Sequence, residues 1–314
     1  MFKLLIENNK DITFYVASEN DLGSFDTFES APYANVIDAS GMEWHELKKE
    51  NIDVMIVLTG LTQYEKNDRF INIINNLSAK FMLLSDDPRC LDSVSEDERI
   101  KRKPDVVISQ FDGEYNFKGT NYYVRYEPIE RASCYKFVPS RKDKDIDVVI
   151  VSNTSGEKYN RVKIVSELIN GMTGLRIYGR LSAEERESLG EGNCKGEVKY
   201  AEMQEILGRS YSTLVVPIKK GWVTSKYVES LMNGVLPIFY EDYNTALLEA
   251  EDLIVVRDNE EFAEAIENVR KDKERTRKLV DEWFKLMIEP YISGKRLSNI
   301  LMSYAFSLKY RKDN

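Results

Sequence analysis

Lys226 and Glu229 are the two side chains whose types and spacing most clearly suggest chemistry. They stand near the start of an amphipathic segment that ends at Asn233-Gly234 and leads into an apolar run, residues 235–240. Residues three apart on a helix project from one face. A cation and the free N–H groups of a helix N-terminus suit phosphates, and a carboxylate suits ribose hydroxyls. The pair therefore predicts a sugar-nucleotide site, although a surface ion pair on a core helix has the same spacing.

A second candidate is the pair of carboxylates Asp86 and Asp87, directly after the apolar run 80–85. A carboxylate at the end of a strand can act as a general base and take the proton of an attacking hydroxyl group. The string continues with Pro88 and Arg89. An Asx turn that carries an Asp–Arg ion pair is therefore the alternative interpretation.

The composition, 42% hydrophobic and 31% charged in 314 residues, is that of a soluble globular protein. Three isolated cysteines have no metal or redox spacing, which predicts reduced thiols and a cytoplasmic location. The single histidine excludes a site with several histidine ligands. The net charge of −9 opposes non-specific nucleic-acid binding. Most of the excess lies in residues 1–140, with 16 Lys and Arg against 24 Asp and Glu.

Apolar runs alternate with amphipathic segments along the chain, which predicts strands alternating with helices. In the first part the expected strands are 1–6, 13–17, 53–60, 80–85, 106–109 and 122–125, and the expected helices are 41–51 and 67–78. In the second part the expected strands are 147–151, 174–179, 212–218, 235–240 and 253–257, and the expected helices are 160–170, 201–208, 258–271, 275–288 and 293–309. The charged stretch 139–145 between the parts is the expected linker.

This alternation is typical of doubly wound parallel sheets, whose ligands bind at the carboxyl ends of the strands. We therefore expect an α/β chain with two Rossmann-like domains. Residues 1–140 form the first, to which a C-terminal helix, 293–314, crosses back, and residues 145–290 form the second. Two such domains whose strand ends face a cleft describe the GT-B architecture of nucleotide-sugar transferases. Periplasmic-type binding proteins contain the same elements, so the motifs have to decide.

Seven segments in order along the chain carry a resemblance: 81–89, 107–110, 126–130, 147–161, 175–179, 196–198 and 224–229. They resemble segments of the T-even phage DNA β-glucosyltransferase family, which moves glucose from UDP-glucose to 5-hydroxymethylcytosine in duplex DNA. Three of the segments lie in the first domain. A protein related only through its donor-binding domain would not share these segments. The resemblance implies a GT-B fold, a UDP-glucose donor and an inverting reaction.

The resemblance also implies roles for single residues. Asp86 occupies the position of the catalytic base, with Asp87 as the alternative. Glu229 occupies the position that holds the ribose, and Lys226 that of an arginine that holds the diphosphate. The other implied donor-binding residues are Ser155, Gly156, Lys158, Arg161, Tyr178, Gly179 and Val198, and the implied acceptor-binding residues are Arg89 and Gln110. In the densest basic run, Lys101 and Arg102 are candidates to grip DNA phosphates, with a solvated loop as the alternative.

The sequence also departs from the family pattern. The donor loop 152–161 has one glycine, whereas the family's loop is glycine-rich and carries two arginines. Lys226 keeps the positive charge of the arginine but loses its bidentate fork. The loop 7–10 lacks an expected glycine, and the first part of the chain is acidic, unlike a domain built to hold duplex DNA.

The predicted function is a monomeric, inverting UDP-sugar transferase with Asp86 as general base, acting on hydroxymethylcytosine or hydroxymethyluracil in bacteriophage DNA. A deep cleft requires the target nucleotide to be flipped out of the duplex. Mg²⁺ or Mn²⁺ would assist the diphosphate, but no ligand cluster requires it. Two alternatives stay open. One is a GT-B transferase with a glycan, lipid, protein or small-molecule acceptor, which the acidic first part favours. The other is a non-catalytic bilobal binding protein.

Overall fold

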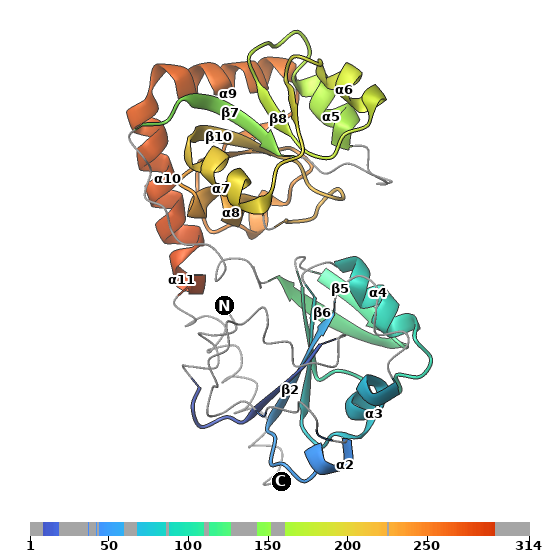
Figure 1. Ribbon diagram of the computed structural model, residues 1–314. Coiled ribbons are helices and arrows are strands. Elements are labelled where there is room, and N and C mark those ends of the chain that lie inside the picture. Colours follow the sequence, from blue (N-terminus) through green and yellow to red (C-terminus); the bar gives the residue numbers. More distant parts are fainter. Residues whose placement is uncertain are drawn as a thin grey trace. The chain divides into compact units, whose positions relative to one another are not determined.

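The computed structural model describes residues 9–18, 37, 42, 44–59, 68–85, 88–109, 113–126, 143–151, 161–224 and 226–292. The chain divides into two compact units, each with its own sheet (Figure 1). The first unit comprises Met1–Ser133 with Tyr291–Asn314, and the second comprises Cys134–Pro290. The predicted strand 1–6 and helix 293–309 lie outside the described residues.

The first unit contains a six-stranded sheet with the order β1-β2-β3-β4-β6-β5. Its strands are β1 (Phe14–Ser18), β2 (Val54–Thr59), β3 (Lys80–Ser85), β4 (Val106–Ser109), β5 (Gly113–Phe117) and β6 (Thr120–Tyr126). All neighbouring pairs are parallel except β5–β6, which is antiparallel. The predicted parallel sheet is therefore present, and the β5–β6 hairpin adds one antiparallel pair at its edge. A two-residue turn at Lys118 and Gly119, with φ of 49° and 77°, joins β5 to β6 as a type I′ hairpin requires.

Three helices accompany the described strands of this sheet: α2 (Trp44–Leu47), α3 (Asp68–Asn76) and α4 (Pro88–Glu96). Helix α3 buries its apolar stripe, which is Phe70, Ile71, Ile73 and Ile74, as its spacing predicts. This stripe joins alternate strand residues such as Met55, Val57, Phe81 and Leu83 in one core. Pro88 begins α4, a position that suits its fixed φ and missing N–H.

The second unit contains a six-stranded sheet with the order β12-β11-β10-β7-β8-β9, and every described pair is parallel. Its strands are β7 (Ile146–Val151), β8 (Arg176–Tyr178), β9 (Cys194–Gly196), β10 (Ser210–Val215), β11 (Leu236–Tyr240) and β12 (Val255–Val256). In this sheet β8 and β9 lie on one side of β7, and β10, β11 and β12 lie on its other side. The strand order therefore reverses at the adjacent strands β7 and β10, which makes this position a topological switch point.

Helices cover both faces of this second sheet (Figure 1). They are α5 (Arg161–Leu168), α6 (Ala183–Leu189), α7 (Tyr200–Gly208), α8 (Lys226–Met232), α9 (Asn259–Lys271) and α10 (Lys273–Met287). The unit also has a short 3₁₀ turn, η3 (Thr245–Leu247), and α11 (Glu289–Ile292) spans the boundary between the two units. Apolar side chains of α5 and α9 share one core with Val148 and Ile150 of β7. Side chains of α7 share another core with Ile146 and Val149 of the same strand. Strand β7 thus lies between two layers, as its continuous apolar run predicts.

Candidate functional site

A pocket lies at the carboxyl ends of β7 and β10, where the strand order of the second sheet reverses. In open α/β sheets this reversal leaves a crevice in which ligands bind. The described residues that line the pocket are Val151, Leu207, Thr213, Leu214, Val215, Lys226, Glu229 and Ser230. Its empty space, about 240 Å³ including the part open to solvent, is smaller than a typical ligand site.

The polar wall of this pocket is helix α8, and its C-terminal end is fixed by backbone hydrogen bonds. Gly234 adopts φ of 70°, and its N–H donates to Leu231 O at 3.0 Å. Val235 N–H donates to Ser230 O at 2.9 Å, which completes a Schellman motif. Strand β11 follows directly, so the register of α8 relative to the sheet is fixed within a few residues.

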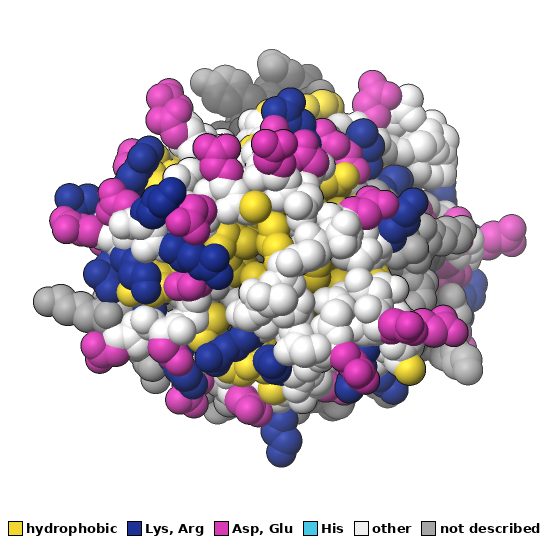
Figure 2. Space-filling view, turned by 90° about the horizontal axis from the view of Figure 1, so that it is seen from above, with side chains coloured by type: hydrophobic (Ala, Val, Ile, Leu, Met, Phe, Trp, Pro, Cys, Tyr) yellow, Lys and Arg dark blue, Asp and Glu magenta, His cyan; other side chains and the backbone are white. Residues whose placement is uncertain are grey.

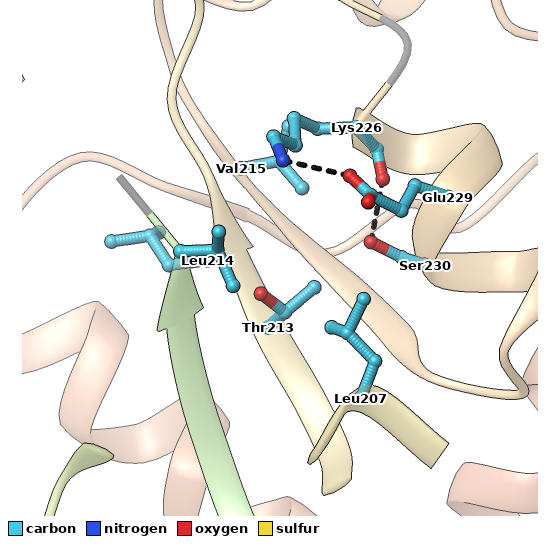
Figure 3. Close-up of a pocket in the computed structure, with 8 residues that line it drawn as sticks. Leu207, Thr213, Leu214, Val215, Lys226, Glu229 and Ser230 are labelled. Carbon is cyan, nitrogen blue, oxygen red and sulfur yellow. Dashed lines mark hydrogen bonds and ion pairs between the residues drawn. The ribbon is translucent and has the colours of Figure 1, made fainter. Parts of the chain in front are cut away.

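Glu229 is buried, with 4% of its surface exposed. Lys226 Nζ donates to Glu229 Oε2 at 2.7 Å, and the lysine side chain is 36% exposed. Figure 3 shows both side chains projecting from α8 toward β10, with Thr213 opposite them. The two residues therefore do form an ion pair, but the carboxylate lies inside a pocket and not on the surface. Such a carboxylate can accept hydrogen bonds from vicinal hydroxyl groups.

The segment that leads into α8 is held by Tyr243, which the sequence did not single out. Thr224 N–H donates to the Tyr243 hydroxyl at 2.9 Å, and that hydroxyl donates to Thr224 O at 2.7 Å. One phenol thus satisfies both backbone groups of a residue two positions before Lys226. Burial raises the pKa of Tyr243 far above its ordinary value, so the hydroxyl keeps its proton. Its only sequence signal is an aromatic residue just after a buried strand.

Three predicted donor-binding residues lie at neighbouring strand ends. Tyr178 ends β8, and Gly179 N–H donates to Gly196 O at the end of β9, at 3.0 Å. Tyr178 and Val198 belong to the same apolar cluster as Val151 and Leu207, which line the pocket. The structure therefore brings this group together around the crevice. Arg161, the first residue of α5, follows the loop after β7, and the remaining predicted loop residues, Ser155, Gly156 and Lys158, lie outside the described residues.

The predicted acceptor side is described only in part. Asp86, Asp87 and Gln110 lie outside the described residues, and Arg89 is described only as a backbone position in α4. The structure does describe the ends of the two strands that precede Asp86 and Gln110, β3 and β4. Ser109 Oγ at the end of β4 donates to Ser85 O at the end of β3, at 3.0 Å, and both serines are buried. Asp86 and Gln110 therefore each follow one of two adjacent strand ends.

Lys101 and Arg102, the predicted grip on DNA phosphates, lie beside the amino-terminal end of β3. The Arg102 guanidinium donates to the backbone oxygens of Leu77 and Ala79, just before β3 begins. It also lies 5.6 Å from the ring centroid of Phe81, and burial lowers its pKa below the usual value. These contacts support the first core, and the contact of Arg102 with DNA phosphates stays a prediction. Lys101 lies at the same end of the sheet, where its N–H donates to Asn75 Oδ1 at 2.8 Å.

Surface charge and ion sites complete the description. On the face in Figure 2, Lys and Arg side chains are interspersed with Asp and Glu and do not form one large basic patch. Among the described residues, no group of three His, Cys, Asp or Glu side chains is placed to hold a metal ion. Within the same residues, no helix has the length and apolar character needed to cross a membrane.

No protein-family model and no curated protein sequence matches the chain. Several solved structures do. One is the T4 phage DNA-modifying enzyme β-glucosyltransferase, studied with and without uridine diphosphoglucose, at a TM-score of 0.63. Others are Anabaena Alr3699/HepE in complex with UDP-glucose, at 0.58, and an α-glucosyltransferase in complex with UDP-glucose and DNA containing an abasic site, at 0.57. Each is 12% identical to this chain and covers 93% of it and 99% of its own length.

The chain has a GT-B fold. The predicted fold class and the predicted structural likeness to the phage β-glucosyltransferase are confirmed. The GT-B fold is shared with glycosyltransferases that use UDP-glucose. At 12% identity the likeness shows the fold, so the chemistry of this chain has to be argued from its own site.

Proposed function

We propose that this chain is a UDP-sugar-dependent glycosyltransferase that moves a hexose, with glucose as the first candidate, to the hydroxymethyl group of a modified pyrimidine in DNA. The observation that carries the proposal is the buried carboxylate of Glu229 in the crevice where the second sheet reverses. A nucleotide in that crevice would present its ribose hydroxyls to this carboxylate. A buried carboxylate is costly to keep even when it is paired with a lysine, as Glu229 is with Lys226, which favours a ligand-binding role.

The proposed reaction is a single displacement at the anomeric carbon. The acceptor hydroxyl loses its proton to a general base as its oxygen bonds to the sugar carbon, and the bond from that carbon to the UDP oxygen breaks. Asp86, directly after β3, is the proposed base, and one displacement inverts the configuration. Arg161 and the loop residues Ser155, Gly156 and Lys158 would stabilise the negative charge that develops on the diphosphate.

A divalent metal ion would assist the departure of the diphosphate by neutralising part of its charge. A structure of the T4 phage enzyme contains UDP and Mn²⁺. Among the described residues of this chain, no group of three His, Cys, Asp or Glu side chains is placed to hold such an ion.

Mass spectrometry of digested nucleosides tests the proposal. The purified chain is incubated with UDP-glucose and duplex DNA that carries hydroxymethylcytosine or hydroxymethyluracil, with unmodified duplex as the substrate control. We expect a mass increase of one hexose on the modified base and none on the control. The variant Glu229→Gln, which keeps the size of the side chain and removes its charge, should lose most of this product at low UDP-glucose. Hydrolysis of UDP-glucose without labelled nucleoside would refute the DNA acceptor and leave the transferase.

A GT-B transferase with another acceptor is the second candidate, and two observations favour it. Residues 1–140 carry 24 acidic against 16 basic residues, a balance that repels a DNA backbone. The densest basic run lies at the amino-terminal edge of the first sheet, away from the strand ends where GT-B ligands bind. The same incubation with glycan, lipid, protein and small-molecule extracts separates the two, because only the second candidate yields a hexose product there.

A further inference from the structure

The ion pair between Lys226 and Glu229 bears on how the donor is bound. Glu229 is almost fully removed from water, and the exposed fraction of its side chain is 5%. A buried carboxylate is costly unless a positive charge or hydrogen-bond donors compensate it. Among the described pocket residues, β7, α7 and β10 contribute Val151, Leu207, Thr213, Leu214 and Val215, none of which carries a charge. Lys226 is therefore the described cation that faces this carboxylate.

The same lysine is poorly suited to serve the diphosphate as well. Its ammonium is a compact point charge, and one of its three donors is directed at Glu229 Oε2 at 2.7 Å. The pair is electrically neutral as a unit, so it offers little net attraction to a diphosphate group. An arginine has five donors in a planar fork and could contact a carboxylate and a phosphate together. A lysine that contacts the Glu229 carboxylate lacks this second set of donors for a phosphate.

We propose that Lys226 is a positioning residue, which offsets the cost of burying the Glu229 carboxylate and directs it at the ribose, and that it is not a ligand of the diphosphate. This inference rests on the proposed function, since it requires a uridine nucleotide in the crevice. The attraction for the diphosphate then comes from other cations of the second unit. Arg161, which begins α5 after the loop that follows β7, is the described candidate.

The two roles are separated by comparing ligands with and without the diphosphate. If Lys226 positions Glu229, the variant Lys226→Met should lose affinity for uridine and for UDP by the same factor, about tenfold or more. The ratio of the two dissociation constants should stay within about twofold of the wild-type ratio. Lys278→Met is the matched control, because it removes an exposed lysine that pairs with Glu274 at 3.0 Å in the same unit. The control should bind both ligands like the wild type.

Glu229→Gln gives a readout that a loss of packing would not move. If Lys226 acts through the Glu229 carboxylate, adding Lys226→Met to Glu229→Gln should cost little further uridine affinity. Equal losses from Lys226→Met in the wild-type and Glu229→Gln backgrounds would overturn the inference.

Lys226→Arg keeps the test decisive if Lys226→Met does not fold. The positioning role predicts wild-type affinity for both ligands, within about twofold, because the charge beside Glu229 is retained. The inference is overturned if UDP binding alone tightens in Lys226→Arg, or if UDP binding alone weakens in Lys226→Met. In both of those cases the wild type still binds UDP, so the proposed function would stand while the inference fails. Failure of the wild type to bind either ligand, in NMR titrations, would instead overturn the proposed function together with the inference.

Discussion

The Tyr243 hydroxyl is a single group on which the entry to α8 depends, and Tyr243→Phe removes only that group. The ring would remain packed against Phe239, whose centroid lies 4.9 Å away. The substitution leaves the N–H and the C=O of Thr224 without their partner, and Thr224 is 6% exposed. Leaving a buried polar group unsatisfied costs about 1–3 kcal/mol. We therefore expect the free energy of unfolding of the second unit to fall by about 2–4 kcal/mol, with some relaxation included.

Urea denaturation followed by tryptophan fluorescence is a suitable assay, since two of the three tryptophans, Trp222 and Trp283, lie in the second unit. Tyr240→Phe is the matched control. Tyr240 ends β11, three residues before Tyr243, and its hydroxyl makes no hydrogen bond with the described residues. The control should change the free energy of unfolding by less than about 0.5 kcal/mol. UDP affinity should fall severalfold in Tyr243→Phe alone, because the segment before Lys226 loosens. Equal stability of the two variants would refute this account of the segment.

Three further predictions follow from the site and from the first unit. Glu229→Ala should weaken UDP binding about tenfold or more in calorimetry, a loss of about 1.4 kcal/mol, and unchanged affinity would contradict the ribose role. Asp86→Asn should abolish hexose transfer while UDP affinity stays at the wild-type level, and if only Asp87→Asn does so the assignment of the base is wrong. Hydrogen bonds from Arg99 lower the pKa of Asp97, so its carboxylate contributes stability above about pH 4 that is lost as the pH falls through the lowered pKa. Asp97→Asn should thus reduce the free energy of unfolding by about 1 kcal/mol at pH 7, and by much less near pH 2.

Much of the fold could be predicted because many elements carry unambiguous patterns. Strand β3 has a continuous apolar run, 81–84, that stops one residue short of each end of the strand, and α3 has a clear helical stripe. The hairpin of β5 and β6 was missed for a physical reason. Its turn residues, Lys118 and Gly119, are not the Asn-Gly or Asp-Gly pair that signals a type I′ turn, and a lysine at φ of 49° is uncommon.

Lys226 and Glu229, which line one pocket, could be singled out from the sequence, but the burial of Glu229 could not. A lysine and a glutamate three apart have the same spacing on an exposed helix as on a buried one. The difference comes from packing, since six of the seven residues of α8, all except Lys226, are buried against their surroundings. Arg102 shows the reverse case. A basic run suggests a binding surface, yet this guanidinium is directed at backbone oxygens of a strand entrance, which no local pattern reveals.

The central claim is that a uridine nucleotide binds in the crevice between β7 and β10 with its ribose on Glu229. Difference electron density from crystals of the intact chain grown with UDP tests it most directly. The account predicts a ribose whose two hydroxyls lie within hydrogen-bonding distance of the Glu229 carboxylate, at the carboxyl ends of both strands. Well-defined UDP density anywhere else in the second unit, with the crevice empty, would contradict it.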